Sequence, residues 1–488
     1  MSKRAVKRIL LPLLLSLCAL GEALGACSGS SPTLTAASAA YTDVKACTDS
    51  ATYGDTVNIP AGTQTWGNTI ALTKDVKLIG AGKAATLLTN AYITFTPDAT
   101  TKTRLGSGGA GMFEVSGIGF TTASTVITIT NSNSAMIRRI KIHDCEFTNT
   151  ATSSMVSAVA YTGDVSGVFY SNVLHQITPS YSSGSDDYSW RSNLMSLGAG
   201  AGWYIEDNTE DWTTGANGYT CMGGGQGMGY VCRYNTATGT AGGSLAYSDS
   251  HGCQVNITGT QITEEYGNKF TVAGSSGFGF RGSKAMVFFN IAAANSISLS
   301  RDYTDTECFA GSISVPAECT SGTNDDSTQS CNDLVDPGTD CVCQKMNHSY
   351  FFVNRVSATG SLTTPSNSAT GTKGVELNRE YFNYNASFDG TSGVGVGSSR
   401  PATCTVGVGY WETAQTVADL TNYTGASPAT PLSGTLYRCT ATDTWTAYYT
   451  PYAYPHPLRG GYTSALAFGA GSGSIAIGAG SGSITISP

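Results

Sequence analysis

Acidic residues stand at the ends of several short, strand-like segments of this chain. Glu206 and Asp207 directly precede Asn208, and Glu265 lies in a later segment of the same kind. Carboxylate oxygens are the ligands that Ca²⁺ prefers in proteins. We therefore expect Glu206, Asp207 and Glu265 to converge on one face of the molecule and to bind a calcium ion.

Basic residues follow in the same part of the sequence. Arg281 and Lys284 lie close together in one segment, and Arg301 follows Arg281 after 20 residues, which is close to one repeat of the segments. A cluster of cations lowers the pKa of one of its members, which then acts as a base, and it also holds an acidic ligand. These three residues are the candidate catalytic groups.

Aromatic residues recur on consecutive segments, at Tyr170, Trp203, Tyr204, Tyr234 and Tyr266. Exposed rings on a flat sheet stack against the faces of sugars, whereas the same rings also pack well inside a β-sheet core. Both interpretations stay open. The five residues are the candidate binding groups for a polysaccharide.

A simpler interpretation of the charged residues is structural. Counted from the Asn that ends each segment, Glu206 and Arg233 occupy the same position on successive segments. Stacked strands would place them about 5 Å apart. A surface ion pair of this kind contributes under about 1 kcal/mol to stability, and Arg281 fits the same pattern with a neighbouring acid.

Short strands are the elements that must position all these groups. Residues 42–51 form an amphipathic segment that predicts a helical cap, and strand-like runs follow from residue 54. Up to about residue 300 these runs are four to six residues long and are broken by Asn, Asp or Gly. No long stretch has a helical period, so the sequence predicts an all-β protein.

The runs share a register. Six of them end at Asp144, Asn172, Asn208, Asn235, Asn268 and Asn290, with gaps of 28, 36, 27, 33 and 22 residues. This spacing fits the coils of a right-handed parallel β-helix, in which Asn tolerates the left-handed conformation of a corner and would stack into a ladder. A β-sandwich or propeller is the alternative, although sandwiches have more hairpin turns and propellers a stricter period.

Three segments carry a resemblance to known proteins. Residues 41–82 resemble the N-terminal cap and first coils of the pectin-lyase-like superfamily, and residues 262–290 and 449–458 resemble largely uncharacterised bacterial β-helix proteins. The resemblance implies a right-handed parallel β-helix over residues 41–460, export and a polysaccharide ligand. In lyases of the superfamily a Ca²⁺ ion neutralises a uronate while an Arg or Lys removes the adjacent proton, and Arg281 and Lys284 resemble such basic residues.

Hydrolases of the superfamily instead use paired carboxylates as acid and base. Fragments similar to a polygalacturonase set occur at residues 139–141, 186–187 and 250–252. Their order differs from that set and one element is missing. His251 is a candidate base, but a lone His beside Asp249 in a turn is more often a hydrogen-bonded loop residue. The hydrolase interpretation is the weaker one.

The composition is typical of an exported, β-rich protein. Charged residues make up 12% of the chain, 59 residues are Gly, 25 are Tyr, and the formal net charge is −8. With no basic patch to bind phosphates, we expect no nucleic-acid partner. Residues 1–26 have the pattern of a signal peptide, in which a basic end precedes an apolar stretch too short to span a bilayer.

Cys27 is the candidate lipidation site. Residues 24–27 resemble a bacterial lipobox, so a lipid on Cys27 would hold the protein at the outer-membrane surface through a tether over 27–40. The alternative is ordinary cleavage near Ala26, which leaves Cys27 for a disulfide. Either route makes the protein extracellular or places it at the cell surface.

Two further segments differ from the β-helix pattern. Of the 14 Cys residues, five lie within 301–345, which predicts a disulfide-rich loop in an oxidising compartment. A zinc site is the alternative, but the spacing of these Cys residues does not match zinc ligand pairs. Residues 461–488 form a Gly/Ser-rich tail that is either flexible or able to add a strand to a partner.

Two functional hypotheses follow. The first is a monomeric surface protein that binds an extracellular polysaccharide and, as an enzyme, cleaves it by Ca²⁺-assisted β-elimination with Arg281 or Lys284 as base. The second is a non-catalytic adhesin or structural stalk that uses the helix as a rigid shaft. A lyase needs a concave groove with converging acids and a base, whereas a stalk needs only a smooth shaft.

Overall fold

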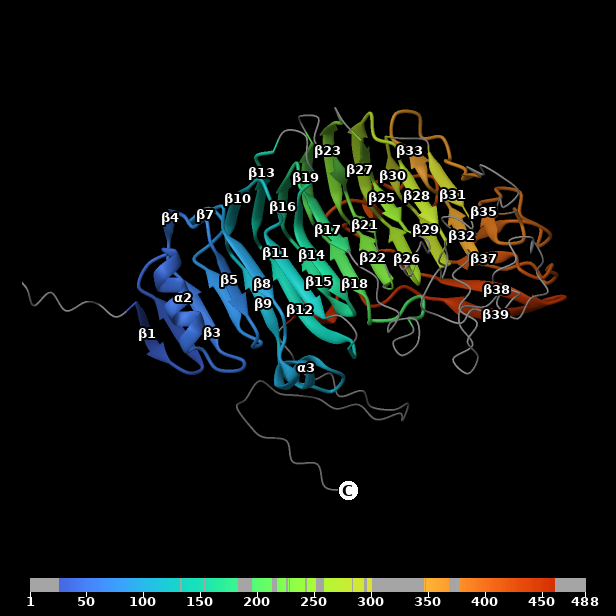
Figure 1. Ribbon diagram of the computed structural model, residues 1–488. Coiled ribbons are helices and arrows are strands. Elements are labelled where there is room, and N and C mark those ends of the chain that lie inside the picture. Colours follow the sequence, from blue (N-terminus) through green and yellow to red (C-terminus); the bar gives the residue numbers. More distant parts are fainter. Residues whose placement is uncertain are drawn as a thin grey trace, which may run out of the picture.

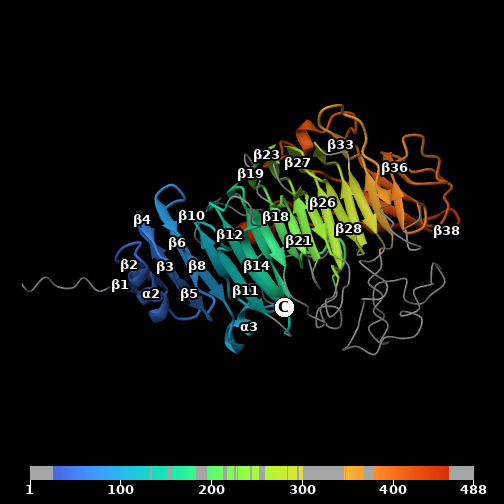
Figure 2. The ribbon, with the colours of Figure 1, turned by 45° about the horizontal axis from the view of Figure 1, so that its top comes forward.

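A computed structural model describes residues 26–460, except for 132–133, 152–154, 183–194, 213–216, 225–226, 228, 242–243, 252–258, 283, 294–295, 301–345, 347, 368–374 and 376. Within these residues the chain winds into a right-handed parallel β-helix (Figures 1 and 2). Each coil adds one strand to each of three long parallel sheets, here called sheets A, B and C. The all-β prediction is confirmed.

Sheet A consists of β1 (Cys27–Ser30), β2 (Thr33–Ala36), β3 (Thr56–Ile59), β6 (Lys77–Gly80), β9 (Phe113–Ser116), β12 (Ile137–His143), β15 (Val165–Tyr170), β18 (Trp203–Glu206), β22 (Gly229–Arg233), β26 (Ile262–Tyr266), β29 (Lys284–Phe288), β32 (Ser349–Phe352) and β35 (Tyr381–Asn383). Sheet B consists of β4 (Gly62–Thr65), β7 (Thr86–Thr89), β10 (Gly119–Thr122), β13 (Glu146–Asn149), β16 (Val173–His175), β19 (Thr209–Trp212), β23 (Thr236–Thr240), β27 (Lys269–Ala273), β30 (Ile291–Ala292) and β33 (Arg355–Val356).

Sheet C consists of β5 (Thr69–Leu72), β8 (Tyr92–Phe95), β11 (Ile127–Asn131), β14 (Ser157–Gly163), β17 (Thr178–Ser182), β21 (Met222–Gly224), β25 (Ser248–Ser250), β28 (Phe278–Arg281), β31 (Ile297–Ser300) and β34 (Ser366–Asn367). Beside it, the short strands β20 (Gly218–Tyr219) and β24 (Leu245–Ala246) pair in parallel. The helix α3 (Ala99–Leu105) lies between β8 and β9 and is capped by the carboxylate of Asp98.

The interior of the shaft is apolar because alternate residues of each strand point inward. Phe120 and Phe147 occupy the same position on neighbouring coils, and their rings stack with centroids 5.3 Å apart. Phe169 continues this cluster from sheet A, with its ring centroid 5.8 Å from that of Phe147. Residues of the opposite parity face outward, and these positions hold the groups that bear on function.

An asparagine ladder runs along the corner between sheets A and B. Asn172, Asn208, Asn235, Asn268 and Asn290 are all buried, and each donates its backbone N–H and its side-chain Nδ2 to the Oδ1 atom of the next Asn at 2.9–3.3 Å. Asn354 receives the last of these bonds. Because every step satisfies two buried donors, the predicted ladder is confirmed.

Two details of the predicted corner are wrong. The left-handed residue is the one before each Asn, as Ser171, Asp207 and Phe289 show with φ near 55°. Asp144 is such a residue, with φ 52°, so it does not belong to the ladder. Cys145 takes the ladder position instead and donates its N–H to Asn172 Oδ1 at 3.0 Å.

The N-terminal end of the shaft is closed by the helix α2 (Tyr41–Ser50) and the antiparallel pair β1–β2. A disulfide joins Cys27 to Cys47 on α2, and β2 pairs in parallel with β3 of the first coil. A sulfur atom in a disulfide cannot carry a lipid thioether, so Cys27 follows the alternative interpretation. Most of the segment 27–40, expected as a tether, is part of this cap.

After β35 the chain leaves the β-helix, which corrects the prediction that the helix continues to residue 460. The strands β36 (Val394–Gly397), β37 (Gly409–Glu412), β38 (Thr435–Ala441) and β39 (Thr444–Tyr449) form a separate mixed sheet, stapled by the disulfide Cys404–Cys439. Residues 384–460 are here called the C-terminal cover. They run back over the outer face of sheet A, from Trp411 against Phe352 to the short helix η2 (Pro457–Arg459) against β12 and β15 (Figure 1).

Disulfides at Cys27–Cys47, Cys221–Cys232 and Cys404–Cys439 indicate an oxidising environment. Cys145 is a buried free thiol. In the part of the chain that the structure describes, no helix is long and apolar enough to cross a membrane. Residues 1–25 of the predicted signal peptide, the loop 301–345 and the tail 461–488 lie outside the described residues, and their predictions stay untested.

Candidate functional site

The outer face of sheet A carries most of the predicted site residues. Tyr170, Glu206, Arg233 and Tyr266 follow one another in register on β15, β18, β22 and β26. The sequence predicted a binding face with aromatic and charged groups at this row. The C-terminal cover lies over it, however, and leaves Glu206, Arg233 and Tyr266 with no exposed surface.

The predicted sugar-binding rings are packing groups. Tyr204 lies 4.5 Å from the ring of His456 in the cover, and Tyr234 lies 4.3 Å from the ring of Tyr454. Trp203 points the other way, into the shaft, where its Nε1 donates to Ser180 at 2.7 Å. Each of these three predicted residues is at most 1% exposed, so none is available to a ligand.

Tyr170 and Tyr266 are also occupied. The ring of Tyr170 stacks on His143 at 4.6 Å and lies 4.6 Å from the guanidinium of Arg459. The ring of Tyr266 stacks on Phe288 at 4.8 Å. The predicted polysaccharide face on sheet A is therefore wrong, because the chain itself covers it.

Arg233 is the centre of this buried interface. Its Nε and Nη2 donate to Glu206 Oε2 at 2.8 and 2.7 Å, and its Nη1 donates to Tyr266 at 2.9 Å. The remaining donors bind the backbone oxygens of Tyr452 and Ala453 in the cover at 2.7 and 2.9 Å. The Glu206–Arg233 pairing is thus confirmed, although the pair is buried rather than at the surface.

The predicted calcium ligands do not fit a metal ion. Glu206 and Asp207 are paired with Arg459, and Glu206 is also paired with Arg233. Glu265 faces the interior, where it accepts a hydrogen bond from Tyr230 at 2.8 Å. Among the described residues, no group of three or more His, Cys, Asp or Glu side chains is placed to hold a metal ion. We therefore derive no calcium-dependent step.

The predicted basic cluster is also divided. Arg281 lies on β28 of sheet C, whereas Lys284 begins β29 of sheet A and lines a separate cavity of about 300 Å³ with Leu197 and Tyr448. Arg301 lies outside the described residues, so its predicted stacking on Arg281 stays a prediction. Of the two described residues, Arg281 is the one that lines the groove described below.

The described fragments similar to a hydrolase set lie on different sheets. Arg139 lies at a bulge in β12 with φ 68° and donates to the backbone oxygen of Gly109 at 3.1 Å. Lys141 lies 3.5 Å from Glu114 on the outer face of sheet A. His251 is near Asp249 at the edge of sheet C, and residues 186–187 lie outside the described part of the chain.

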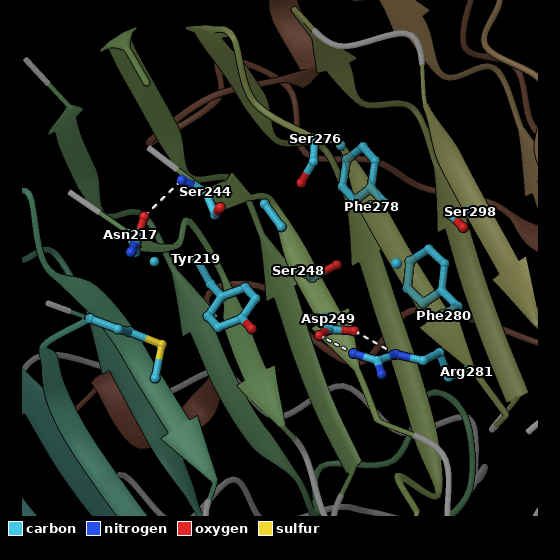
Figure 3. A pocket seen from close by; sticks show the side chains of 15 residues that line it. Asn217, Tyr219, Ser244, Ser248, Asp249, Ser276, Phe278, Phe280, Arg281 and Ser298 are labelled. Carbon is cyan, nitrogen blue, oxygen red and sulfur yellow. Dashed lines mark hydrogen bonds and ion pairs between the residues drawn. The ribbon is translucent and has the colours of Figure 1, made fainter. Parts of the chain in front are cut away.

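A groove of about 560 Å³ lies over sheet C and holds Arg281 (Figure 3). The strands β25, β28 and β31 form its floor, and β20 and β24 supply a further wall. Its described lining residues are Met155, Asn217, Gly218, Tyr219, Ser244, Ala246, Ser248, Asp249, Ser276, Gly277, Phe278, Gly279, Phe280, Arg281 and Ser298. Unlike the row of Tyr170, Glu206, Arg233 and Tyr266 on sheet A, which the C-terminal cover buries, this face carries a hollow that a ligand can enter.

Asp249 and Arg281 form an ion pair on neighbouring strands in the groove. Arg281 Nε donates to Asp249 Oδ1 at 3.0 Å, and Nη2 donates to Oδ2. His251 Nε2 lies 3.1 Å from the same Oδ2. Burial alone would raise the pKa of Asp249, but the hydrogen bond with His251 and the charge of Arg281 hold it below its ordinary value. Asp249 is therefore ionised at neutral pH.

Tyr219 supplies an aromatic ring beside this pair. Its ring lies directly over Gly223, because a Cβ atom at Gly223 would come within 2.3 Å of it. Burial and the adjacent Asp249 raise the pKa of Tyr219 to about 12. The phenol is neutral near pH 7, so it stacks and hydrogen-bonds rather than acting as a base.

Gly279 leaves an open slot in the floor. The register aligns Asp249, Gly279 and Ser298 on β25, β28 and β31. A Cβ atom built on Gly279 would make only ordinary contacts, the nearest being Asp249 Oδ1 at 3.4 Å. The space above Gly279, between the side chains of its two neighbours, is here called the Gly279 slot.

Comparison of the chain with protein-family models, with curated proteins and with solved structures finds no match. The site therefore rests on its own geometry.

Tyr219, Gly223 and Gly279 were not among the predicted site residues. A signal for the two glycines exists in the sequence, because each sits between apolar or core-facing neighbours at an outward position of a strand. Glycine inside a strand weakens it and often marks a place where a ligand approaches the backbone. Tyr219 had no comparable signal, since its position depends on how β20 folds beside sheet C.

Proposed function

We propose that this protein is an exported β-helix protein that binds an extracellular polysaccharide in the sheet C groove. The observation that carries the proposal is the groove itself, in which the ring of Tyr219 and the Asp249–Arg281 pair lie side by side above a floor of small residues. Aromatic rings stack on sugar faces, and paired charges exchange hydrogen bonds with sugar hydroxyl groups.

The same proposal includes the superfamily of the protein and its export. A parallel β-helix with an N-terminal helical cap is compatible with the pectin-lyase-like superfamily, whose resemblance is carried by residues 41–82. The disulfides and the basic, apolar pattern of residues 1–26 support export. Binding is favoured over glycoside hydrolysis because the described lining of the groove contributes one carboxylate, Asp249, whereas hydrolysis uses a pair.

The proposal is tested by measuring binding of the mature protein to a panel of neutral and acidic polysaccharides, using affinity electrophoresis and calorimetry. Arg281→Ala and Tyr219→Ala are each expected to weaken binding at least about tenfold, since each removes a group worth more than about 1.4 kcal/mol. Lys45→Ala, a charge change on α2 at the far end of the shaft, serves as the matched control and should leave binding unchanged.

A non-catalytic stalk or adhesin is the second candidate, favoured by the continuous asparagine ladder, which stiffens the shaft from Asn172 to Asn354. The same experiment separates the two. Retention by no polysaccharide, or retention that neither Arg281→Ala nor Tyr219→Ala changes, would contradict the groove proposal and favour the stalk.

A further inference from the structure

We infer that the ligand of the sheet C groove is an uncharged, hydroxyl-rich sugar chain, and that one of its sugar rings occupies the Gly279 slot. This inference rests on the proposed function and narrows it to a class of ligand and to a subsite. It also replaces the expectation from the sequence that a cluster of cations would hold an acidic sugar.

The charges in the groove argue for a neutral ligand. Among its described lining residues, Asp249 and Arg281 are the ionised side chains, and they are paired with each other. Recognition of a polyanion needs an excess of positive charge along the binding face. The lining offers none, and the whole chain carries a formal net charge of −8.

The remaining polar groups of the lining suit hydroxyl groups. Tyr219, Ser244, Ser276 and Ser298 contribute hydroxyls, and Asn217 contributes a side-chain amide. Such groups donate and accept hydrogen bonds without carrying charge. A sugar hydroxyl does the same, so the two surfaces match in chemistry.

The Gly279 slot has the form of a subsite. Neighbouring strands lie about 4.8 Å apart, so the backbones of β25 and β31 at Asp249 and Ser298 lie about 10 Å apart on either side of Gly279. Asp249 Oδ1 leans toward the slot, to 3.4 Å from the place of a Gly279 Cβ atom, where it can accept a hydrogen bond from a sugar hydroxyl. Asp249 on β25 and Ser298 on β31 flank Gly279, and Arg281, two residues further along β28, is paired with Asp249.

The backbone does not require glycine at this position. Gly279 lies in β28 and its φ is outside the left-handed region, so a residue with a side chain would fit the strand. Glycine in a strand costs stability relative to residues that pack. At Gly223 the missing side chain makes room for Tyr219, whereas at Gly279 a Cβ atom would fit with ordinary contacts, so no ring of the chain requires the glycine there.

The decisive variant is Gly279→Val, which fills the slot and suits a β-strand. We expect it to lower the affinity for a neutral glucan or mannan at least about tenfold without lowering the thermal midpoint by more than a few degrees. Gly279→Ala, whose added methyl group makes only ordinary contacts, should have a smaller effect in the same direction. A loss of affinity that increases from Gly279→Ala to Gly279→Val, with the thermal midpoint kept, distinguishes filling of the slot from misfolding.

Ala160→Val is the matched control. Ala160 lies on β14 in the same outward row of sheet C, which runs from Ala160 through Tyr181, Gly223 and Asp249 to Gly279, but it is outside the groove lining. The affinity of the Ala160→Val variant for the neutral glycan should equal that of the unmodified protein. Affinity for the neutral glycan should also change less than about twofold between 50 and 500 mM NaCl, since no ion pair with the ligand is screened.

Three results would overturn the inference. Strongest binding to a polyuronate or a sulfated glycan, weakened at least about tenfold by the same rise in salt, would show that the ligand is acidic while leaving the groove as the binding site. Neutral-glycan binding that Tyr219→Ala abolishes but Gly279→Val does not change would place the ligand outside the slot. Binding to no glycan at all would remove the proposed function together with this inference.

Discussion

The outer faces of sheets A and C carry similar residue types but differ in what lies over them. Each has an Arg paired with an acid on the neighbouring strand and a tyrosine close by. On sheet A the pair is Arg233 and Glu206, with no exposed surface, and on sheet C it is Arg281 and Asp249, with side chains 27% and 16% exposed.

The difference arises from contacts between segments far apart in the chain. Arg233 binds the backbone oxygens of Tyr452 and Ala453, which lie 219 and 220 residues later. A cation with all its donors satisfied by its own chain holds the fold together, whereas a partly exposed one beside a groove is available to a ligand. On a β-helix, therefore, an outward position becomes a candidate site only where no later segment covers it.

The largest expected difference between the two faces is in stability. Arg233→Ala leaves Glu206 buried beside fewer donors and frees two carbonyl oxygens of the cover, so it should lower the free energy of unfolding by about 3–5 kcal/mol. Arg281→Ala should lower it by under about 1 kcal/mol, because its pair is partly exposed. Urea unfolding followed by tryptophan fluorescence measures both.

The variant with the smaller loss of stability should have the larger loss of binding. Arg281→Ala should weaken polysaccharide binding, and Arg233→Ala, measured at a temperature where it is fully folded, should not. Equal losses of stability in the two variants would mean that the cover is not anchored as strongly as its contacts indicate, and the contrast between the faces would fail.

The next largest effect is in the pH dependence of stability, which should have opposite signs on the two faces. Burial raises the pKa of Glu264, under the cover, to about 7, although Gly198, Tyr449 and Arg233 favour its ionised form. The folded protein then binds this proton more tightly than the unfolded chain, whose pKa is near 4.5. The free energy of unfolding should fall as pH rises from about 4.5 to about 7, by up to about 3 kcal/mol.

Glu264→Gln should remove this contribution from a series of urea unfolding curves between pH 4 and pH 8. Glu265, on the same strand but inside the shaft, also has its pKa raised to about 7 by burial, so part of the slope should remain and Glu265→Gln should remove that part. A slope unchanged by both variants would show that neither carboxyl group is protonated in the folded state.

Asp249 on the open face should act in the other direction. Its pKa is held below the ordinary value of 3.8, so its stabilising contribution is present above that value and is lost as pH falls through the lower folded pKa. Asp249→Asn should therefore flatten the stability curve only on the acid side, below about pH 4. A change near neutral pH instead would contradict the assignment of an ionised Asp249.

The repeat of the shaft was predictable because it is local. Asn at each corner is followed by a short strand, and the spacing of the Asn residues alone indicates stacked coils. Cys145, which stands in the place of an Asn, still donates its backbone N–H to Asn172 Oδ1, but it has no side-chain amide to donate. Sequence spacing placed Asp144 in the ladder because the acid resembles Asn in a turn.

The faces were not predictable to the same degree. Trp203 and Tyr204 are consecutive residues of one strand, so they point to opposite sides and cannot both bind one ligand. Glu264 and Glu265 are divided in the same way, and the choice of Glu265 as a calcium ligand selected the inward member of the pair. A one-residue error in register is enough to exchange surface for core.

Coverage by a distant segment has no local signal at all. The pattern around Tyr170, Glu206 and Arg233 is that of an exposed face, and only the contacts with residues 449–459 make it an interior. Arg281 was placed in the site for a different reason, as a base, and its neighbour Asp249 was considered only as the residue beside His251 in a loop. The groove needed Tyr219 from another strand pair to become recognisable.

The smallest expected effect compares two hydroxyl groups, one on each face. Tyr454, in the cover, donates to both carboxylate oxygens of Asp207 at 2.8 and 2.9 Å. Tyr454→Phe should lower the free energy of unfolding by about 1–2 kcal/mol, since a bond to an ionised acceptor is lost and the ring is kept. Tyr219→Phe should change stability by under about 0.5 kcal/mol, because Tyr219 lies at the partly exposed wall of the groove.

In binding, the order should again reverse, with Tyr219→Phe weakening the affinity for a neutral glycan a few-fold and Tyr454→Phe leaving it unchanged. Both variants keep an aromatic ring, so a difference between them reports the hydroxyl alone. Calorimetry at a single pH near 7, where both phenols are neutral, measures the affinities, and urea unfolding of the same preparations measures the stabilities. If Tyr454→Phe reduced glycan affinity as much as Tyr219→Phe, the cover would belong to the binding face, and the division of the molecule into a closed face and an open one would have to be abandoned.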